Sequence, residues 1–125
     1  MADPSFTQAN STVDRLIGGD KKLVTREVTL TDLAAGALTR GTVLGMITAS
    51  GKYAISKSAA VDGSQTARAI LAKDADPSGG DVTAVIYDEG EFNEDRLTLG
   101  TGHTAASVRE DLRAVGIHLK KPVAA

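Results

Sequence analysis

The chain has no cysteine and no tryptophan, and among its 125 residues there are only two phenylalanines and two tyrosines. The lack of cysteine excludes disulfides, thiolate catalysis and cysteine-ligated zinc. Because aromatic bulk is scarce, the core must come from Val, Ile, Leu and Ala. We therefore expect a thin core, which gains stability by association with partners.

Long apolar runs and clustered positive charge are also missing. Since no run of about 18 apolar residues occurs, we expect no membrane-spanning helix and no membrane partner. The first twelve residues, MADPSFTQANST, lack the basic and apolar regions of a signal peptide, so we expect synthesis in the cytoplasm. A net charge of -2, with dispersed basic residues, gives no electrostatic reason to bind nucleic acid.

Residues 1–22 differ from the rest of the chain. Pro4, Asn10 and Gly18 interrupt any periodic pattern, and apolar residues are sparse there. This composition predicts a flexible N-terminal arm over residues 1–22, ahead of a β-rich domain over residues 23–125. An ordinary frayed terminus is the alternative, although some twenty residues is long for fraying.

Apolar patterns in the remaining chain predict several short strands and one late helix. We expect strands at residues 24–30, 42–48, 52–57, 66–72 and 81–87, with a turn at Pro77-Ser78-Gly79-Gly80. Thr104 is a suitable N-cap and Gly116 a suitable C′ glycine for a helix over residues 104–115, with Val108, Leu112 and Val115 on one face. The segment IHLKKPV that follows reads as extended. The expected fold is mainly β, with one C-terminal helix.

Eight of the sixteen acidic residues lie between Asp74 and Asp95, with no Lys or Arg among them. Asp74-Ala75-Asp76-Pro77-Ser78-Gly79 resembles the start of a calcium loop, but the twelfth position is Val85, which has no carboxylate. Five of the others fall in DEGEFNED, residues 88–95, which we interpret as a solvated turn rather than an acid–base pair.

The two histidines do not suggest a catalytic or metal site. His103 lies just before the expected helix and His118 alternates in the last extended segment, so we expect capping or surface roles. No glycine pattern for phosphate binding occurs, and no general base accompanies the hydroxyl residues. We predict no catalytic, cofactor-binding or metal-binding residue, and hence no enzyme.

The run from Ala69 to Leu97, with ILAKDAD, SGGDVTA and GEFNED, resembles the tailed-bacteriophage head decoration proteins, in particular the lambda-like head decoration protein D family. The closing TAASVREDLRAVGIHLKKPV and the hairpin GTVLGMITASGKYAISKS are similar to the same family. Together these segments cover about residues 24–123. The resemblance implies a β-barrel of the β-tulip kind within an α+β domain.

The resemblance also implies a structural role without catalysis. Such a protein binds the outer surface of the expanded virion head as a homotrimer, at local three-fold positions. There it contacts the major capsid protein and cements the shell against the pressure of packaged DNA. The arm is implied to make the capsid contact, and the residues expected to do so are Pro4, Phe6, Thr7, Val13, Leu16 and Ile17. An apolar face including Val43, Met46 and Ile47 is a candidate for the trimer contact.

Two other classes of function stay open on sequence grounds. A small β-barrel carrier or ligand-binding module is the main alternative, because Lys52 follows the turn glycine Gly51 in a hairpin. The flanking residues, Gly51 and Tyr53, differ from the usual carrier motif. A small hydrolase that uses Glu89 and Glu91 is a third hypothesis.

Overall fold

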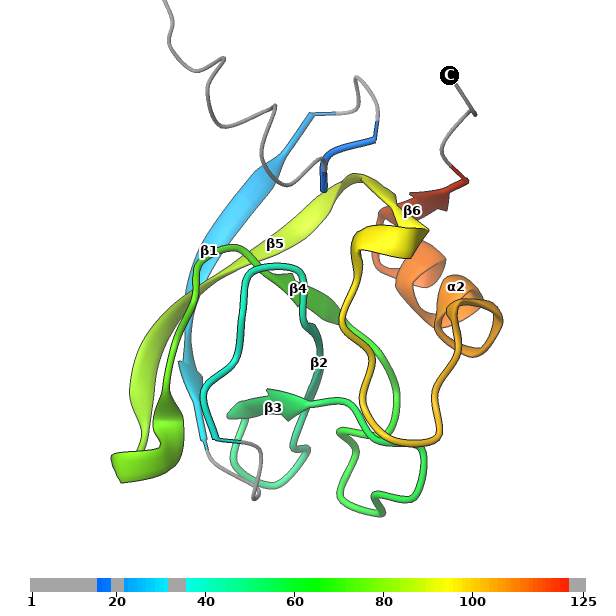
Figure 1. Cartoon of the computed structure of the whole chain (residues 1–125). Helices are drawn as coiled ribbons and strands as arrows, with labels where there is room; N and C mark the ends of the chain where they lie inside the picture. Colours follow the sequence, from blue (N-terminus) through cyan, green and yellow to red (C-terminus); the bar gives the residue numbers. More distant parts are fainter. Residues whose placement is uncertain (1–15, 19–21, 32–35, 122–125) are drawn as a thin grey trace, which may run out of the picture.

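The computed structural model describes residues 16–18, 22–31 and 36–121, and the fold is mainly β with one helix near the C-terminus (Figure 1). The strands are β1 (Val24–Leu30), β2 (Val43–Met46), β3 (Tyr53–Ile55), β4 (Ala69–Leu71), β5 (Val82–Asn93) and β6 (Ile117–Lys120). The helix α2 spans Ala105–Ala114, and two short 3-10 turns, η1 and η2, span Pro77–Gly79 and Glu94–Arg96.

Five of the strands close into a barrel. Their order is β1-β3-β2-β4-β5, and β1 also pairs with β5 over its whole length, from Val24 opposite Glu89 to Leu30 opposite Val82. Closure leaves these strands with neighbours on both sides, which removes exposed sheet edges. β6 lies outside the barrel and pairs in parallel with the second half of β5.

Two apolar clusters lie on opposite faces of the same strands. In β4, Ala69 and Leu71 belong to one cluster with Leu44 and Ile86, whereas Ile70 belongs to the other with Phe92. The second cluster also holds Val108 and Leu112 of α2, so the helix covers the outer face of the barrel wall. Burial on both faces explains the continuous apolar runs in the sequence of β2 and β4.

The helix forms where the sequence predicts it. The Thr104 hydroxyl accepts a hydrogen bond from the Ser107 amide, and the Ser107 side chain accepts from the Thr104 amide, which completes a capping box. Gly116 follows with φ +96°, the left-handed conformation that ends helices. Val108 and Leu112 are fully buried, whereas Val115, just after the last turn of the helix, is 36% exposed.

The segment DEGEFNED is not the turn that the sequence suggests. β5 continues through Asp88 to Asn93 and ends only at η2. The strand changes partners at Gly90, whose φ of +153° lets the backbone bend close to the ring of Phe92. Strand pairing with β1 before Gly90 and with β6 after it overrides the polar composition.

Candidate functional site

The acidic side chains of β5 and its flanking turns form ion pairs with neighbouring elements. Asp81 lies 2.6 Å from Lys52 Nζ, which follows the β2–β3 turn, and Asp88 lies 2.7 Å from Arg26 Nε on β1. Glu91 pairs with Lys120 on β6 at 3.3 Å, and Glu94 pairs with Arg109 on α2. Three carboxylates of DEGEFNED, together with Asp81, therefore attach the longest strand and its flanking turns to four different parts of the fold.

Arg26 shows how one of these pairs is built into the barrel wall. Its guanidinium binds both carboxylate oxygens of Asp88, and its Nη2 donates to the Tyr53 hydroxyl at 3.0 Å. The hydrogen bond with Asp88, followed by that with Tyr53, raises the pKa of Arg26 above its ordinary value. Arg26 shares the alternate positions of β1 with the apolar residues Val24, Val28 and Leu30, and it fastens β1 to β5 and β3.

In the segment that resembles a calcium loop, the aspartates accept hydrogen bonds from neighbouring protein groups. The Asp76 carboxylate accepts hydrogen bonds from the Ser78 hydroxyl at 2.6 Å and the Ser78 amide at 3.0 Å, and these bonds, the first above all, lower its pKa. Asp74 accepts from the Arg40 amide at 2.7 Å. Among the described residues, no group of three or more His, Asp or Glu side chains is placed to hold a metal ion.

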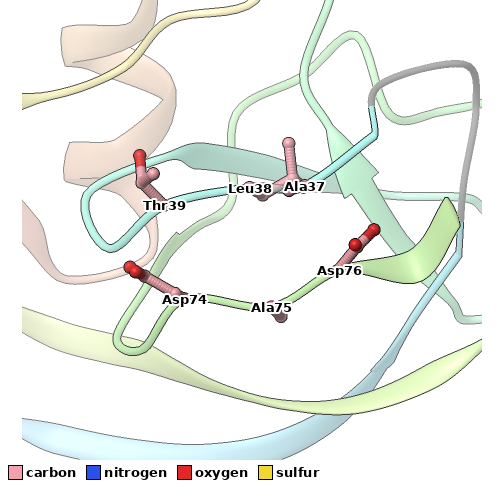
Figure 2. A pocket seen from close by; sticks show the side chains of 6 residues that line it. All are labelled: Ala37, Leu38, Thr39, Asp74, Ala75 and Asp76. Carbon is pink, nitrogen blue, oxygen red and sulfur yellow. The ribbon is translucent and has the colours of Figure 1, made fainter.

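A shallow groove runs between two short segments that pair through Leu38 and Ala75 (Figure 2). Its lining residues are Ala37, Leu38, Thr39, Asp74, Ala75 and Asp76. Figure 2 shows the carboxylates of Asp74 and Asp76 at its two ends. Both carboxylates accept the hydrogen bonds described above.

His103 connects three separate parts of the chain. Its Nε2 lies 2.9 Å from the Gln65 carbonyl oxygen and 3.2 Å from Ser56 Oγ, and its Nδ1 lies 2.9 Å from Ser107 Oγ. Because a carbonyl oxygen only accepts, Nε2 must carry a proton, and so it is not poised to take one from Ser56. Sequence reasoning placed His103 beside the helix cap but missed its long-range partner.

The hairpin lysine of the carrier hypothesis is held in an ion pair. Lys52 lies beside Asp81, whose pKa is lowered first by the hydrogen bond from Lys52 and then by one from Thr31. Its side chain is 43% exposed. The contact fixes the β2–β3 turn to the start of β5, which is a structural role.

The residues expected to bind the capsid fall into two groups. Pro4, Phe6, Thr7 and Val13 lie outside the described residues. Leu16 is only 1% exposed and belongs to the cluster beneath α2, and Ile17 packs against the same cluster. These two side chains contact the core of the domain itself, and the capsid contact expected of them stays a prediction.

The proposed trimer face is only partly available. Val43 is fully buried inside the chain's own core, so it is wrong as an interface residue. Met46 and Ile47 are half-buried and retain some exposed surface.

The two ends of the described chain meet on β5. Residues 16–18 pair antiparallel with β5 through Ile17 and Phe92, while β6 pairs in parallel with β5 on the other side, with Leu119 opposite Phe92. Figure 1 shows both segments, blue and red, at the same end of the molecule. Because residues 16–18 run antiparallel to β5, Leu16 is the residue of this segment that lies nearest the end at which β5 finishes. Because β6 runs parallel to β5, it ends at the same end of the molecule.

No helix in the described ranges is long and apolar enough to cross a membrane. Comparison with curated proteins gives no significant match. Residues 5–118 match the family model for the bacteriophage lambda head decoration protein D. That match spans most of the chain, including the barrel, the helix and most of the N-terminal segment. The chain therefore belongs to the bacteriophage lambda head decoration protein D family.

Proposed function

We propose that this protein is a cement protein, which binds the outside of the expanded phage head as a homotrimer at local three-fold positions. In this role it stabilises the shell against the pressure of packaged DNA, and its partner is the major capsid protein. Family membership over residues 5–118 is the observation that carries the proposal. The family is one of structural capsid proteins, not a class of enzymes.

The N-terminal segment is proposed to make the principal capsid contact. The family match begins at residue 5, so this segment is part of the family's pattern and not an unrelated extension. An extended arm that adds a strand to an exposed sheet edge gains main-chain hydrogen bonds. Ordering the arm costs free energy, so three arms acting together in one trimer supply the affinity.

The end of the molecule where β5 finishes is proposed to face the capsid. Residues 16–18 and β6 flank β5 there: Leu16, the first residue of its segment, lies beside Asn93 at this end, and β6 runs towards it. An arm that leaves the domain at this end reaches a capsid that faces the same end without crossing the barrel. Lys121 is exposed beside the same end, next to Lys120, which is paired with Glu91.

Co-sedimentation with purified heads tests the proposal. The protein should pellet with expanded heads and stay in solution with unexpanded ones. A variant without residues 1–15 should keep the barrel fold, as shown by circular dichroism, and lose head binding. Full binding by this truncated variant would refute the role of the arm, while no binding by the intact protein would refute the cement function.

A further inference from the structure

The segment Leu16–Gly18 is attached to the barrel by its backbone and by one side chain. The Asn93 amide donates to the Leu16 carbonyl oxygen at 2.8 Å, and the Gly18 amide donates to the Glu91 carbonyl oxygen at 2.8 Å. Leu16 is inserted into the cluster beneath α2, with a 1% exposed side chain. Three consecutive residues are thus held by two backbone hydrogen bonds and a fully buried anchor.

The segment Leu16–Gly18 also packs closely against the barrel. A Cβ atom on Gly18 would lie 2.7 Å from Asn93 Oδ1 and 3.0 Å from the Phe92 carbonyl carbon, so a larger residue there would push the segment off β5. At the other end, Leu16 Cδ1 lies 3.7 Å from the Cβ position of Gly41. The small residue at position 18 therefore lets the segment lie against β5, while the distance at Gly41 is that of an ordinary van der Waals contact.

Ile17 keeps one edge open. The two hydrogen bonds of this bridge are made by Leu16 and Gly18, so the N–H and C=O groups of Ile17 point away from β5 in the alternation of antiparallel pairs. They have no hydrogen-bond partner among the described residues. The segment is thus already an extended edge, suited to continue into a strand paired with another chain.

We infer that Leu16–Gly18 is the root of the capsid-binding arm, which fixes the point and the direction from which residues 1–15 reach the capsid. The inference rests on the proposed function and refines it. The arm is then residues 1–15, not 1–22, and it starts from a segment that is hydrogen-bonded to β5. Leu16 and Gly18 are positioning residues: they hold the arm in place and are not required to touch the capsid.

Inserting a linker distinguishes between two hypotheses: an arm whose position is fixed by Leu16–Gly18, and an arm that acts only as a flexible tether. Inserting Gly-Ser-Gly-Ser between Arg15 and Leu16 lengthens a free fifteen-residue tether by four, which lowers its effective concentration by only about 1.4-fold per arm, or roughly threefold for three arms. If the root sets the register of the arm on the capsid, the loss of affinity for expanded heads should exceed tenfold. The same insertion between Gly79 and Gly80, in the exposed turn after η1, is the matched control and should leave binding unchanged.

Hydrogen exchange on the free protein gives a second readout. The amides of Gly18 and Asn93 should be protected, whereas that of Ile17 should exchange fast. Two results would refute the role of Leu16–Gly18 as the root of the arm. One is a loss of affinity for expanded heads of threefold or less on insertion, and the other is a Gly18 amide that exchanges at the rate of an unstructured peptide. Failure of the intact protein to bind any head would instead overturn the proposed function, so the two failures are distinguishable.

Discussion

His103 reaches Gln65 across 38 residues of sequence, with its Nε2 atom 2.9 Å from the Gln65 carbonyl oxygen. Since Nδ1 of the same ring lies 2.9 Å from Ser107 Oγ in the first turn of α2, one side chain fastens the helix to the loop between β3 and β4. The neighbouring loop backbones are also bonded, through the Ser58 amide and the Thr101 carbonyl oxygen. His103 thus locks the helix cap to the barrel.

Replacing His103 should therefore destabilise the fold. His103→Ala leaves the Gln65 carbonyl and the buried Ser56 hydroxyl without this partner, which we expect to lower the free energy of unfolding by about 1–3 kcal/mol. Urea denaturation followed by circular dichroism measures the change. Thr101→Ala, at an exposed site in the same loop, is the control and should shift stability by less than about 0.5 kcal/mol. Equal stabilities of the two variants would contradict the locking role.

Gly45 lies where β2 passes against the loop before β4. A Cβ atom at Gly45 would be 2.1 Å from the Ser64 carbonyl oxygen, so Gly45→Ala should force the loop outward and cost about 1–3 kcal/mol or more. Gly79→Ala is the matched control, because nothing lies within 4 Å of a Cβ atom there. Thermal unfolding should show a clearly lower midpoint for Gly45→Ala and little change for Gly79→Ala. A tolerated Gly45→Ala would show that this approach is not as close as described.

Leu16 tests where the domain begins. Its side chain is buried in the core, so Leu16→Ala should lower the free energy of unfolding by about 2–5 kcal/mol. Leu23, 39% exposed, is the comparison and should cost less when changed to alanine. A chain that starts at residue 16 should unfold like the intact protein, and one that starts at residue 23 should be less stable. Equal stability of all three chains would place the boundary at residue 22, as the composition suggests.

Stability should fall at acid pH through the aspartates that accept hydrogen bonds. The Ser64 hydroxyl, and then its amide, lower the pKa of Asp62 below its ordinary value of 3.8, and Ser78 does the same for Asp76. A carboxyl group whose pKa is depressed in the folded state stabilises the fold above its unfolded pKa, and the contribution is lost as pH falls through the folded pKa. The midpoint temperature of thermal unfolding should hence decrease as the pH is lowered below about 4. Asp62→Asn should flatten that drop, and an unchanged pH profile would contradict the assignment.

Local pattern was sufficient to predict most of the elements. The alternation in VTREVTL predicts β1 at its observed bounds, and Thr104 with Gly116 predicts both ends of α2. These signals are local because strand alternation, caps and C-terminal glycines act within a few residues. The same holds for the turn at Pro77, where Asp76 caps η1.

Features that depend on partners distant in sequence were not predictable from the pattern. The second half of β5 looks like a turn, and its pairing with β6 and with residues 16–18 makes it a strand. Arg26 looks like an error in the alternation of β1 until Asp88 and Tyr53 are seen beside it. Leu16 looks like part of a loose arm because nothing nearby in sequence reveals that it fills the core beneath α2.

Electron microscopy of expanded heads, with and without the protein, tests the central claim most directly. The cement function predicts added density on the outer surface at the local three-fold positions, with three copies at each and a connection from each copy into the capsid at the end where β5 finishes. Heads that show no added density, or density away from the three-fold positions, would contradict it.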